Sequence, residues 1–169
     1  MDIDYFETTQ YLEWLKEKLW LNHVASKAKT RVVKRGEVYE CNFGVGIGSE
    51  ERKKRPCVIL QNDIANKSSS NVLVAPISHT GKVSPVVIPI TTRQDESGAL
   101  LLDGYVLVGN MTCVSKARLD KYISKLNKPE MDAVDQAIIV QAGLLHKFNG
   151  LNNVITDKDK YIKKLKIDS

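Results

Sequence analysis

The sequence predicts an α+β domain that is mainly β, in which a small antiparallel sheet lies between two helical segments. Short runs of β-branched and aromatic residues, separated by turn residues, begin at Arg35. Apolar residues recur at helical spacing before this region and again after it. The 169 residues suit one core with added segments, because single domains commonly hold about 100 to 150 residues.

Five runs predict the strands: "GEVYECNF", "PCVILQND", "NVLVAPIS", "SPVVIPI" and "GYVLVGNMTCV". Gly44, Gly46 and Gly48 follow the first run, where the chain needs the backbone freedom of a turn. Pro89 has no amide hydrogen to donate, so it indicates an edge strand or a bulge. Short strands joined by such turns favour antiparallel pairing.

An N-terminal helix is predicted over residues 4–29, because apolar residues fall on one of its faces: Tyr5, Leu12, Leu15 and Leu19. Other large apolar residues lie off this stripe: Phe6, Trp14, Trp20 and Leu21. A helix that is apolar beyond one face needs a second contact. This helix therefore either folds wholly against its own domain or also contacts a partner subunit.

A second helix is predicted to begin after Asn127, a good N-cap, with Glu130 placed for a capping box, and to end near Gly143. Its core-facing residues are Met131, Val134, Ile138, Ala142 and Leu145. Residues 147–169 carry six lysines against three aspartates, which indicates a solvated tail or a short terminal helix. The expected organisation is an N-terminal helical extension (1–30), a central domain (31–146) and a lysine-rich tail (147–169).

Composition narrows the function classes. The formal net charge of +5 and the pI near 9.0 suit a polyanionic partner, because Lys and Arg gain affinity for phosphates by releasing counterions. Apolar stretches are only a few residues long and no basic, apolar leader opens the chain, so we expect a cytoplasmic protein without a membrane span. Neither the three cysteines nor the three histidines have metal-ligand spacing, so we expect no metal and no cofactor.

The stretch "GSEERKKRPCVIL" is the candidate for chemistry, because Arg52, Lys53, Lys54 and Arg55 run directly into an apolar strand. Pro56 restricts Arg55 to extended geometry at the mouth of that strand. An arginine held there can present its planar guanidinium to a phosphate and stays charged. The alternative is an ordinary solvated loop.

Five blocks follow one another along the chain: "VKRGEVYECNF", "GSEERKKRPCVILQND", "VLVAPIS", "YVLVGNMTCVSKARL" and a helix through "AGLL". In this order, over residues 33 to about 145, they resemble the MazF/PemK family of toxin endoribonucleases. The combination of Gly-Ser-Glu, Arg-Pro and Gln-Asn-Asp at this spacing is far more specific than any one piece. The central domain, 31–146, is therefore expected to be a MazF/PemK-like toxin domain.

The resemblance implies an SH3-like or CcdB-like antiparallel β-barrel with a C-terminal helix, usually a homodimer, that cleaves single-stranded RNA without a metal. Arg55 is expected to stabilise the reacting phosphate and Ser78 to hold it, both as catalytic residues. The substrate 2′-hydroxyl attacks its own phosphodiester and leaves a 2′,3′-cyclic phosphate and a 5′-hydroxyl. The candidate RNA-binding residues around them are Ser49, Glu50, Arg52, Lys53, Lys54, His79, Asn110 and Thr112.

Four positions depart from the family pattern. Ser78 stands where Thr is common, and Asn110 with Thr112 stands where a Gln-x-Arg pair is frequent. Glu51 follows Gly-Ser-Glu where Gln is frequent, which places another carboxylate near a polyanion. The preference for particular RNA bases therefore does not transfer.

The implied partners are single-stranded mRNA and a small cognate antitoxin whose acidic, apolar C-terminal segment fills the RNA groove. The toxin–antitoxin complex is expected to bind operator DNA through the antitoxin. A non-catalytic CcdB-like binding protein, or an inactive family member that only binds RNA or a partner, is the competing hypothesis. A further hypothesis is that the N-terminal helix limits access to the groove.

Overall fold

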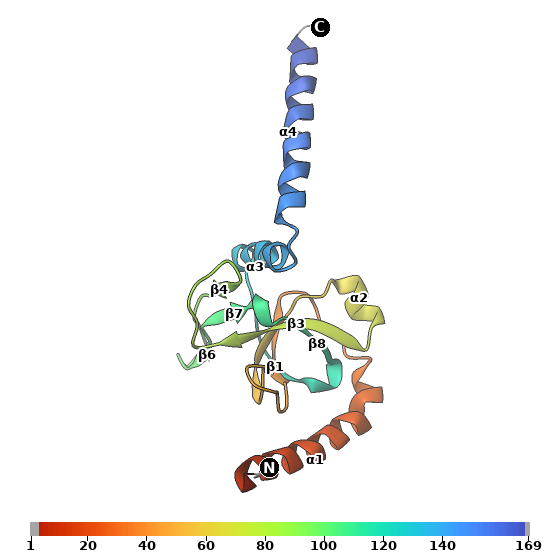
Figure 1. Ribbon diagram of the computed structural model, residues 1–169, viewed down its shortest axis with the longest axis vertical. Helices are drawn as coiled ribbons and strands as arrows, with labels where there is room; N and C mark the ends of the chain where they lie inside the picture. Colours follow the sequence, from red (N-terminus) through yellow and green to blue (C-terminus); the bar gives the residue numbers. More distant parts are fainter. Residues whose placement is uncertain (1–3, 168–169) are drawn as a thin grey trace.

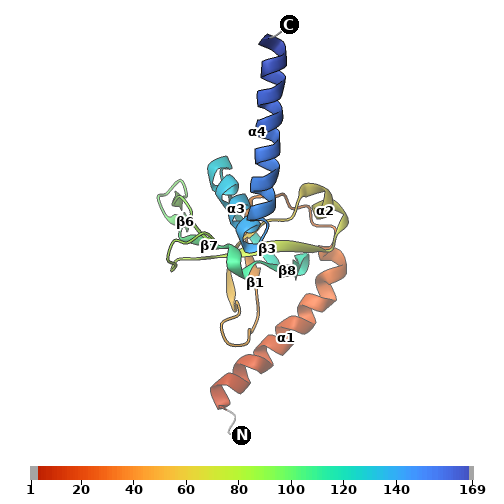
Figure 2. The same cartoon turned by 45° about the horizontal axis from the view of Figure 1, so that its top comes forward.

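In the computed structural model, which describes residues 4–167, an antiparallel sheet forms the body and two long helices extend from it (Figure 1). Helix α1 (Tyr5–Ala28) lies below one end of the sheet, whereas α4 (Leu145–Ile167) projects from the opposite end (Figure 2). The prediction of a mainly antiparallel α+β protein is confirmed.

The main sheet has seven strands: β1 (Glu37–Asn42), β2 (Lys54–Ile59), β3 (Asn71–Ser78), β4 (Val87–Pro89), β7 (Tyr105–Leu107), β8 (Thr112–Ser115) and β9 (Leu119–Lys125). Their order is β4-β7-β3-β2-β1-β9, and β8 also pairs with β3. Strands β5 (Arg93–Gln94) and β6 (Leu100–Leu102) form a separate ribbon. Within residues 4–167 these pairings do not close, so the structure gives no support for a closed barrel.

Two predicted strands are shorter than their apolar runs. Strand β4 holds only Val87–Pro89 and lies at the end of the sheet order, as the missing amide hydrogen of Pro89 suggests. The run "GYVLVGNMTCV" is interrupted by a 3₁₀ helix, η1 (Val108–Asn110). The interruption is required because β7 and β8 both pair with β3, but at different ends of it.

Apolar side chains cover both faces of the sheet. One cluster includes Val58, Ala75 and Val106 and packs against Val134 and Ala137 of α3 (Lys128–Gln141). The other cluster, on the opposite face, contains buried residues of five strands and the chain before them: Val33, Tyr39, Cys41, Cys57, Ile59, Val72, Val74, Val114 and Leu119. Strand β2 is buried only from Cys57 onward, whereas its first three residues, Arg55 among them, are exposed or partly buried.

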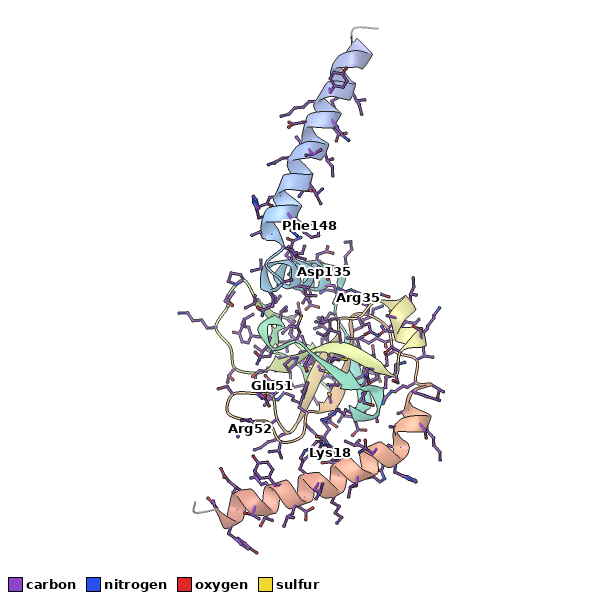
Figure 3. All side chains as sticks on the ribbon, turned by 45° about the vertical axis from the view of Figure 1, so that its right-hand side comes forward. Lys18, Arg35, Glu51, Arg52, Asp135 and Phe148 are labelled. Carbon is purple, nitrogen blue, oxygen red and sulfur yellow. The ribbon has the colours of Figure 1, made fainter. Side chains whose placement is uncertain are left out.

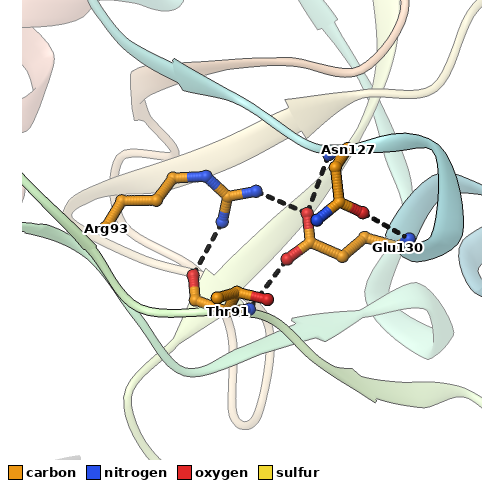
Figure 4. Close-up of polar contacts among 4 residues, drawn as sticks. All are labelled: Thr91, Arg93, Asn127 and Glu130. Atoms are coloured by element: carbon orange, nitrogen blue, oxygen red, sulfur yellow. Dashed lines mark hydrogen bonds and ion pairs between the residues drawn. The ribbon is translucent and has the colours of Figure 1, made fainter.

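The predicted capping box of α3 is present. The side chain of Asn127 accepts from the backbone of Glu130, and Glu130 accepts from the Asn127 amide at 2.8 Å. Glu130 also accepts from the Thr91 amide at 2.7 Å and pairs with Arg93 (Figure 4). Burial alone would raise the pKa of the Glu130 carboxyl, but these hydrogen bonds lower it below its ordinary value.

Part of the predicted α3 face differs from the structure. Val134 is buried and Met131 and Ile138 are partly buried, but Ala142 and Leu145 are exposed. The helix ends at Gln141, and Gly143 follows with a φ of +69° that turns the chain away from the sheet. Leu145 therefore belongs to the next helix.

The apolar stripe predicted for α1 is exposed, with Tyr5, Leu12, Leu15 and Leu19 all facing away from the sheet. The helix instead contacts the body through Leu21 and Trp14, which lie off that stripe. The Trp14 ring occupies the space where a side chain on Gly44 would stand, 2.3 Å from an ideal Cβ, and Gly44 has a φ of +80°. The missing side chain lets the helix approach the β1–β2 hairpin closely.

Helix α4 replaces the expected tail with 23 helical residues beginning at Leu145. Its apolar residues, including Phe148, Leu151 and Ile155, are exposed because the helix points away from the sheet (Figures 1 and 2). A short helix α2 (Asp63–Ser68) and a 3₁₀ helix η2 (Lys116–Arg118) complete the described elements. Within residues 4–167, no helix has the length and apolar character needed to cross a membrane.

Candidate functional site

The two residues predicted to be catalytic lie at the ends of neighbouring antiparallel strands. Arg55 is in β2, and Ser78 is the last residue of β3. The pairing of these strands ends at Cys57 and Pro76, so Arg55 and Ser78 each lie two residues beyond the last pair, at the same end of the two strands. The strand register thus brings an arginine and a hydroxyl to one edge.

Arg55 is only partly engaged by its surroundings. Its Nη1 lies 2.7 Å from a carboxylate oxygen of Glu51, and the side chain is 30% exposed. Its Nε is buried and has no hydrogen-bond partner among the described residues. An unsatisfied buried donor costs free energy, and such groups are often explained by a missing binding partner. Arg55 therefore keeps one unsatisfied donor, which lies beneath the surface in this structure.

Glu51 connects Arg55 to another predicted residue. Its carboxylate accepts from the Asn110 side-chain amide at 2.7 Å while it pairs with Arg55, and only 11% of its side chain is exposed. Sequence reasoning identified Glu51 as a departure but did not include it in the site. Its position four residues before Arg55 could have indicated the ion pair. The contact with Asn110 spans 59 residues, and no local sequence pattern indicates it.

A pocket of about 730 Å³ gathers four of the predicted RNA-binding residues: Ser49, Glu50, Asn110 and Thr112. Glu51 also lines it, and α1 supplies another wall through Lys18 and Leu21. Figure 3 labels Lys18 on α1 and both Glu51 and Arg52 on the loop above it. We refer to this cavity as the loop pocket. Its lining combines polar and apolar side chains.

The remaining predicted residues lie elsewhere. Lys53 and Lys54 are exposed and line a second pocket, on the other side of the hairpin, and Arg52 lines neither. The Ser78 hydroxyl lies 3.3 Å from that of Thr80, and His79 pairs with Asp103. The structure therefore divides the predicted shell among the loop pocket, the second pocket and the edge of β3.

Local contacts shape the loop before β2. The Glu50 carboxylate accepts from the Ile47 amide at 3.0 Å, which stabilises the turn. The Lys53 amide donates to Gly44 at 2.7 Å, and Lys53 has a φ of +64°, which is uncommon outside glycine. Strain of this kind persists where the surroundings enforce it and is common at functional sites.

Two basic residues of η2 have structural contacts. Lys116 is buried, its Nζ donates to the Asn66 carbonyl at 2.6 Å, and burial lowers its pKa. Arg118 donates to the Asn42 carbonyl at 2.9 Å and stacks on Trp14, with its guanidinium carbon 5.1 Å from the ring centre. Both side chains therefore stabilise the fold.

The described residues contain no group of three or more His, Cys, Asp or Glu side chains placed to hold a metal ion. Cys41 and Cys57 are buried and reduced, whereas Cys113 is exposed. The charged residues that line the loop pocket are Lys18, Glu50, Glu51 and Arg118.

The architecture is that of a small, mainly antiparallel α+β protein with a basic loop that leads into β2. A family model identifies the family within that class. Residues 34–142 match the PemK-like, MazF-like toxin of type II toxin-antitoxin systems, and the chain belongs to this family. The match leaves out α1 and α4.

Individual relatives agree. Endoribonuclease EndoA of Bacillus subtilis (strain 168) is 31% identical over 115 residues, which are 68% of this chain and 97% of EndoA. MazF from Deinococcus radiodurans has a similar structure, with a TM-score of 0.57 at 18% identity over 67% of this chain and 98% of that one. An endoribonuclease in complex with its cognate antitoxin, from a mycobacterial species, has a TM-score of 0.56 at 23% identity, covering 66% and 96% of the two chains. The structural likeness establishes the fold.

Proposed function

We propose that this protein is the toxin of a type II toxin–antitoxin pair and acts as a metal-independent, sequence-preferring endoribonuclease on single-stranded mRNA. The observation that carries this proposal is the Arg55 guanidinium, whose Nε is buried without a partner among the described residues at the edge it shares with Ser78. The similarity to EndoA, an endoribonuclease, supports the same activity.

The chemistry needs little from the protein beyond positioned donors. The substrate 2′-oxygen attacks the adjacent phosphorus, the bond from phosphorus to the 5′-oxygen breaks, and a 2′,3′-cyclic phosphate and a 5′-hydroxyl result. Negative charge grows on the phosphoryl oxygens, where Arg55 and Ser78 donate hydrogen bonds. The 2′-hydroxyl loses one proton to base and the 5′-oxygen gains one. Because the pKa of arginine is above about 12, Arg55 acts through its charge and not as a proton donor.

Partners follow from the same family. We propose a cytoplasmic homodimer neutralised by an acidic antitoxin segment, and operator binding by the toxin–antitoxin complex through the antitoxin. The structure of a relative with its cognate antitoxin supports the first part. We also propose that residues 31–146 form the toxin domain, with the curvature of an SH3-like or CcdB-like barrel, and that residues 1–30 and 147–169 are extensions.

One observation favours the competing function of a non-catalytic CcdB-like binding protein or an inactive family member. Glu51 pairs with Arg55 and accepts from Asn110, so the two groups expected to contact RNA already hold a carboxylate. A substrate phosphate must displace that carboxylate before Arg55 can act. This displacement opposes RNA binding.

The test is cleavage of a long single-stranded RNA in EDTA by the full chain and by Arg55→Ala, with the new ends mapped. We expect cuts that end in cyclic phosphate and 5′-hydroxyl, and a rate about a thousandfold lower for Arg55→Ala. Arg52→Ala, which removes an exposed charge from the same loop, should lower the rate only a few-fold. A folded wild-type protein that cuts none of several RNAs would favour the binding protein.

A further inference from the structure

Helix α1, which lies outside the family match, forms one wall of a second pocket of about 820 Å³. Three aromatic side chains of the helix line this pocket: Phe6, Trp14 and Trp20. The facing wall is the end of the β1–β2 hairpin, where Lys53 and Lys54 are exposed. We refer to this cavity as the aromatic pocket. It combines large flat apolar surfaces with cations, and neither is needed to fold the hairpin.

We infer that the aromatic pocket binds the stretch of single-stranded RNA next to the scissile phosphate, with bases stacked on Trp20 and Phe6 and phosphates at Lys53 and Lys54. The inference rests on the proposed function. Proteins that hold single strands commonly pair aromatic platforms for the bases with a basic track for the backbone. Trp20 is 61% exposed and Phe6 is 68% exposed, so their rings are open to a base.

The aromatic pocket lies near Arg55 in the chain but on the other side of the end of the β1–β2 hairpin. Lys54 precedes Arg55 in β2, and successive strand residues face opposite sides. Phe43 lines the loop pocket, whereas its neighbours Asn42 and Gly44 line the aromatic pocket. The two pockets are thus the two sides of one hairpin end, and α1 borders both. A strand bound at Arg55 needs to pass only around this hairpin end to reach the aromatic rings.

Charge decides how the strand is oriented. Lys16, Lys53 and Lys54 line the aromatic pocket, but so do Glu13 and Glu17 of α1. The two carboxylates repel a phosphate placed over the helix. The phosphates therefore belong on the hairpin side and the bases on the helix side. Lys54 is available there, since its ion pair with Asp120 is long, 3.6 Å, and about half exposed on both sides.

The aromatic wall is held in place before any ligand binds. The Trp14 ring fills the space over Gly44 and stacks with the guanidinium of Arg118, which in turn donates to Asn42. This contact fixes α1 against the hairpin. A preorganised wall binds more tightly, because less conformational freedom is lost on binding.

Tryptophan fluorescence tests the inference directly, since Trp14 and Trp20 are the two tryptophans of the chain and both line the aromatic pocket. The probe is a short 2′-O-methyl oligonucleotide of mixed sequence, which lacks the attacking hydroxyl. We expect the oligonucleotide to quench the fluorescence of the full chain. Trp20→Ala should bind it about tenfold more weakly, the loss expected for one stacked base.

Matched variants separate this site from general effects. Tyr11→Ala removes an exposed aromatic residue of α1 that lines neither pocket, and should bind like wild type. The slope of the logarithm of affinity against the logarithm of salt concentration should be about one unit shallower for Lys53→Gln, as expected for one lost phosphate contact. Lys27→Gln should leave this slope unchanged. Circular dichroism confirms that each variant is folded.

The outcomes distinguish this inference from the proposed function. If wild type cleaves RNA but oligonucleotides leave the fluorescence unchanged and Trp20→Ala binds normally, the aromatic pocket is not an RNA site. If Trp20→Ala weakens binding although wild type cleaves nothing, the pocket is an RNA site on a non-catalytic protein. If Trp20→Ala changes self-association in sedimentation and not RNA affinity, a second copy of the chain covers the pocket and the inference is wrong.

Discussion

Two arginine–glutamate pairs in this protein have the same chemistry and opposite surroundings. Arg93 and Glu130 are 17% and 7% exposed, and Glu130 also accepts from two backbone amides, while Arg93 donates to the Thr91 carbonyl at 2.8 Å (Figure 4). Arg55 and Glu51 are 30% and 11% exposed, and the Arg55 Nε has no partner among the described residues. The first pair belongs to a completed hydrogen-bond network, whereas the second pair leaves one donor of Arg55 unsatisfied.

The difference separates stability from function. A buried pair whose hydrogen bonds are satisfied ties α3 to the chain after β4, and removing one member leaves the other charge stranded. A pair with an unused donor, beside a pocket, can exchange its carboxylate for a ligand. Side chains of the same type thus have roles set by what else they contact.

The largest effect on stability is expected for Glu130→Gln. The change leaves Arg93 buried without its counter-charge and weakens the capping box, so the free energy of unfolding should fall by about 3 kcal/mol. Urea unfolding measures it. Glu51→Gln is the matched control and should change stability by less than about 1 kcal/mol. Equal losses for both would remove the distinction between the two pairs.

Ser78 tests the other side of the functional pair. Ser78→Ala removes the hydroxyl at the end of β3, beyond the same last strand pair as Arg55, and should lower the cleavage rate about thirtyfold, or about 2 kcal/mol in activation free energy. Ser78→Thr keeps the hydroxyl and restricts its rotamer, so it should cleave at least as fast as wild type. Single-turnover cleavage measures both, and an unaffected alanine variant would exclude Ser78 from the chemistry.

Acid should weaken the completed network. The folded-state pKa of Glu130 lies below its ordinary value of 4.5, so its contribution to stability is present above that value and is lost as pH falls through the lowered pKa. Wild type should therefore lose stability in acid more steeply than Glu130→Gln, which has no carboxyl to protonate there. Urea unfolding from pH 7 downward gives the two profiles, and parallel profiles would contradict the assignment.

The smallest of these effects is the change in cleavage activity that we expect for Glu51→Gln. A glutamine can still contact Arg55 and Asn110 but carries no charge to compete with a phosphate. The specificity constant, kcat/KM, should rise about threefold, mainly through a lower KM. Glu50→Gln is a useful comparison, because the Glu50 carboxylate stabilises the loop turn and should not gain activity. A fall in kcat for Glu51→Gln would instead make Glu51 part of the catalytic machinery.

Local signals predicted local structure well. The N-cap at Asn127 and the capping glutamate were correctly placed, because a capping box spans only four residues. Most strands were found from their β-branched runs, and the pairing of β2 with β3, which leaves Arg55 and Ser78 at the same end, depends on them. The break at η1 was missed, because it arises from two strands sharing β3 and leaves no mark in the apolar pattern.

The misses in the site are all contacts between distant segments. The bond from Asn110 to Glu51, the burial of Lys116 and the stacking of Arg118 on Trp14 join residues far apart in the sequence. Helix α1 has large apolar residues on more than one side, so periodicity could not decide which of them faces the sheet. A glycine in the hairpin decided it by leaving room for Trp14.

The Cβ atom that Gly44 lacks also gives a way to find related proteins. A side chain at position 44 and an indole at position 14 cannot occupy the same space, so a docked helix of this kind requires a tryptophan-and-glycine pair. Family members that carry an N-terminal extension can therefore be sorted by two letters of sequence. Those with the pair are expected to hold the extension against the hairpin as a fixed part of the toxin, and those with a bulky residue at the glycine position must place it elsewhere.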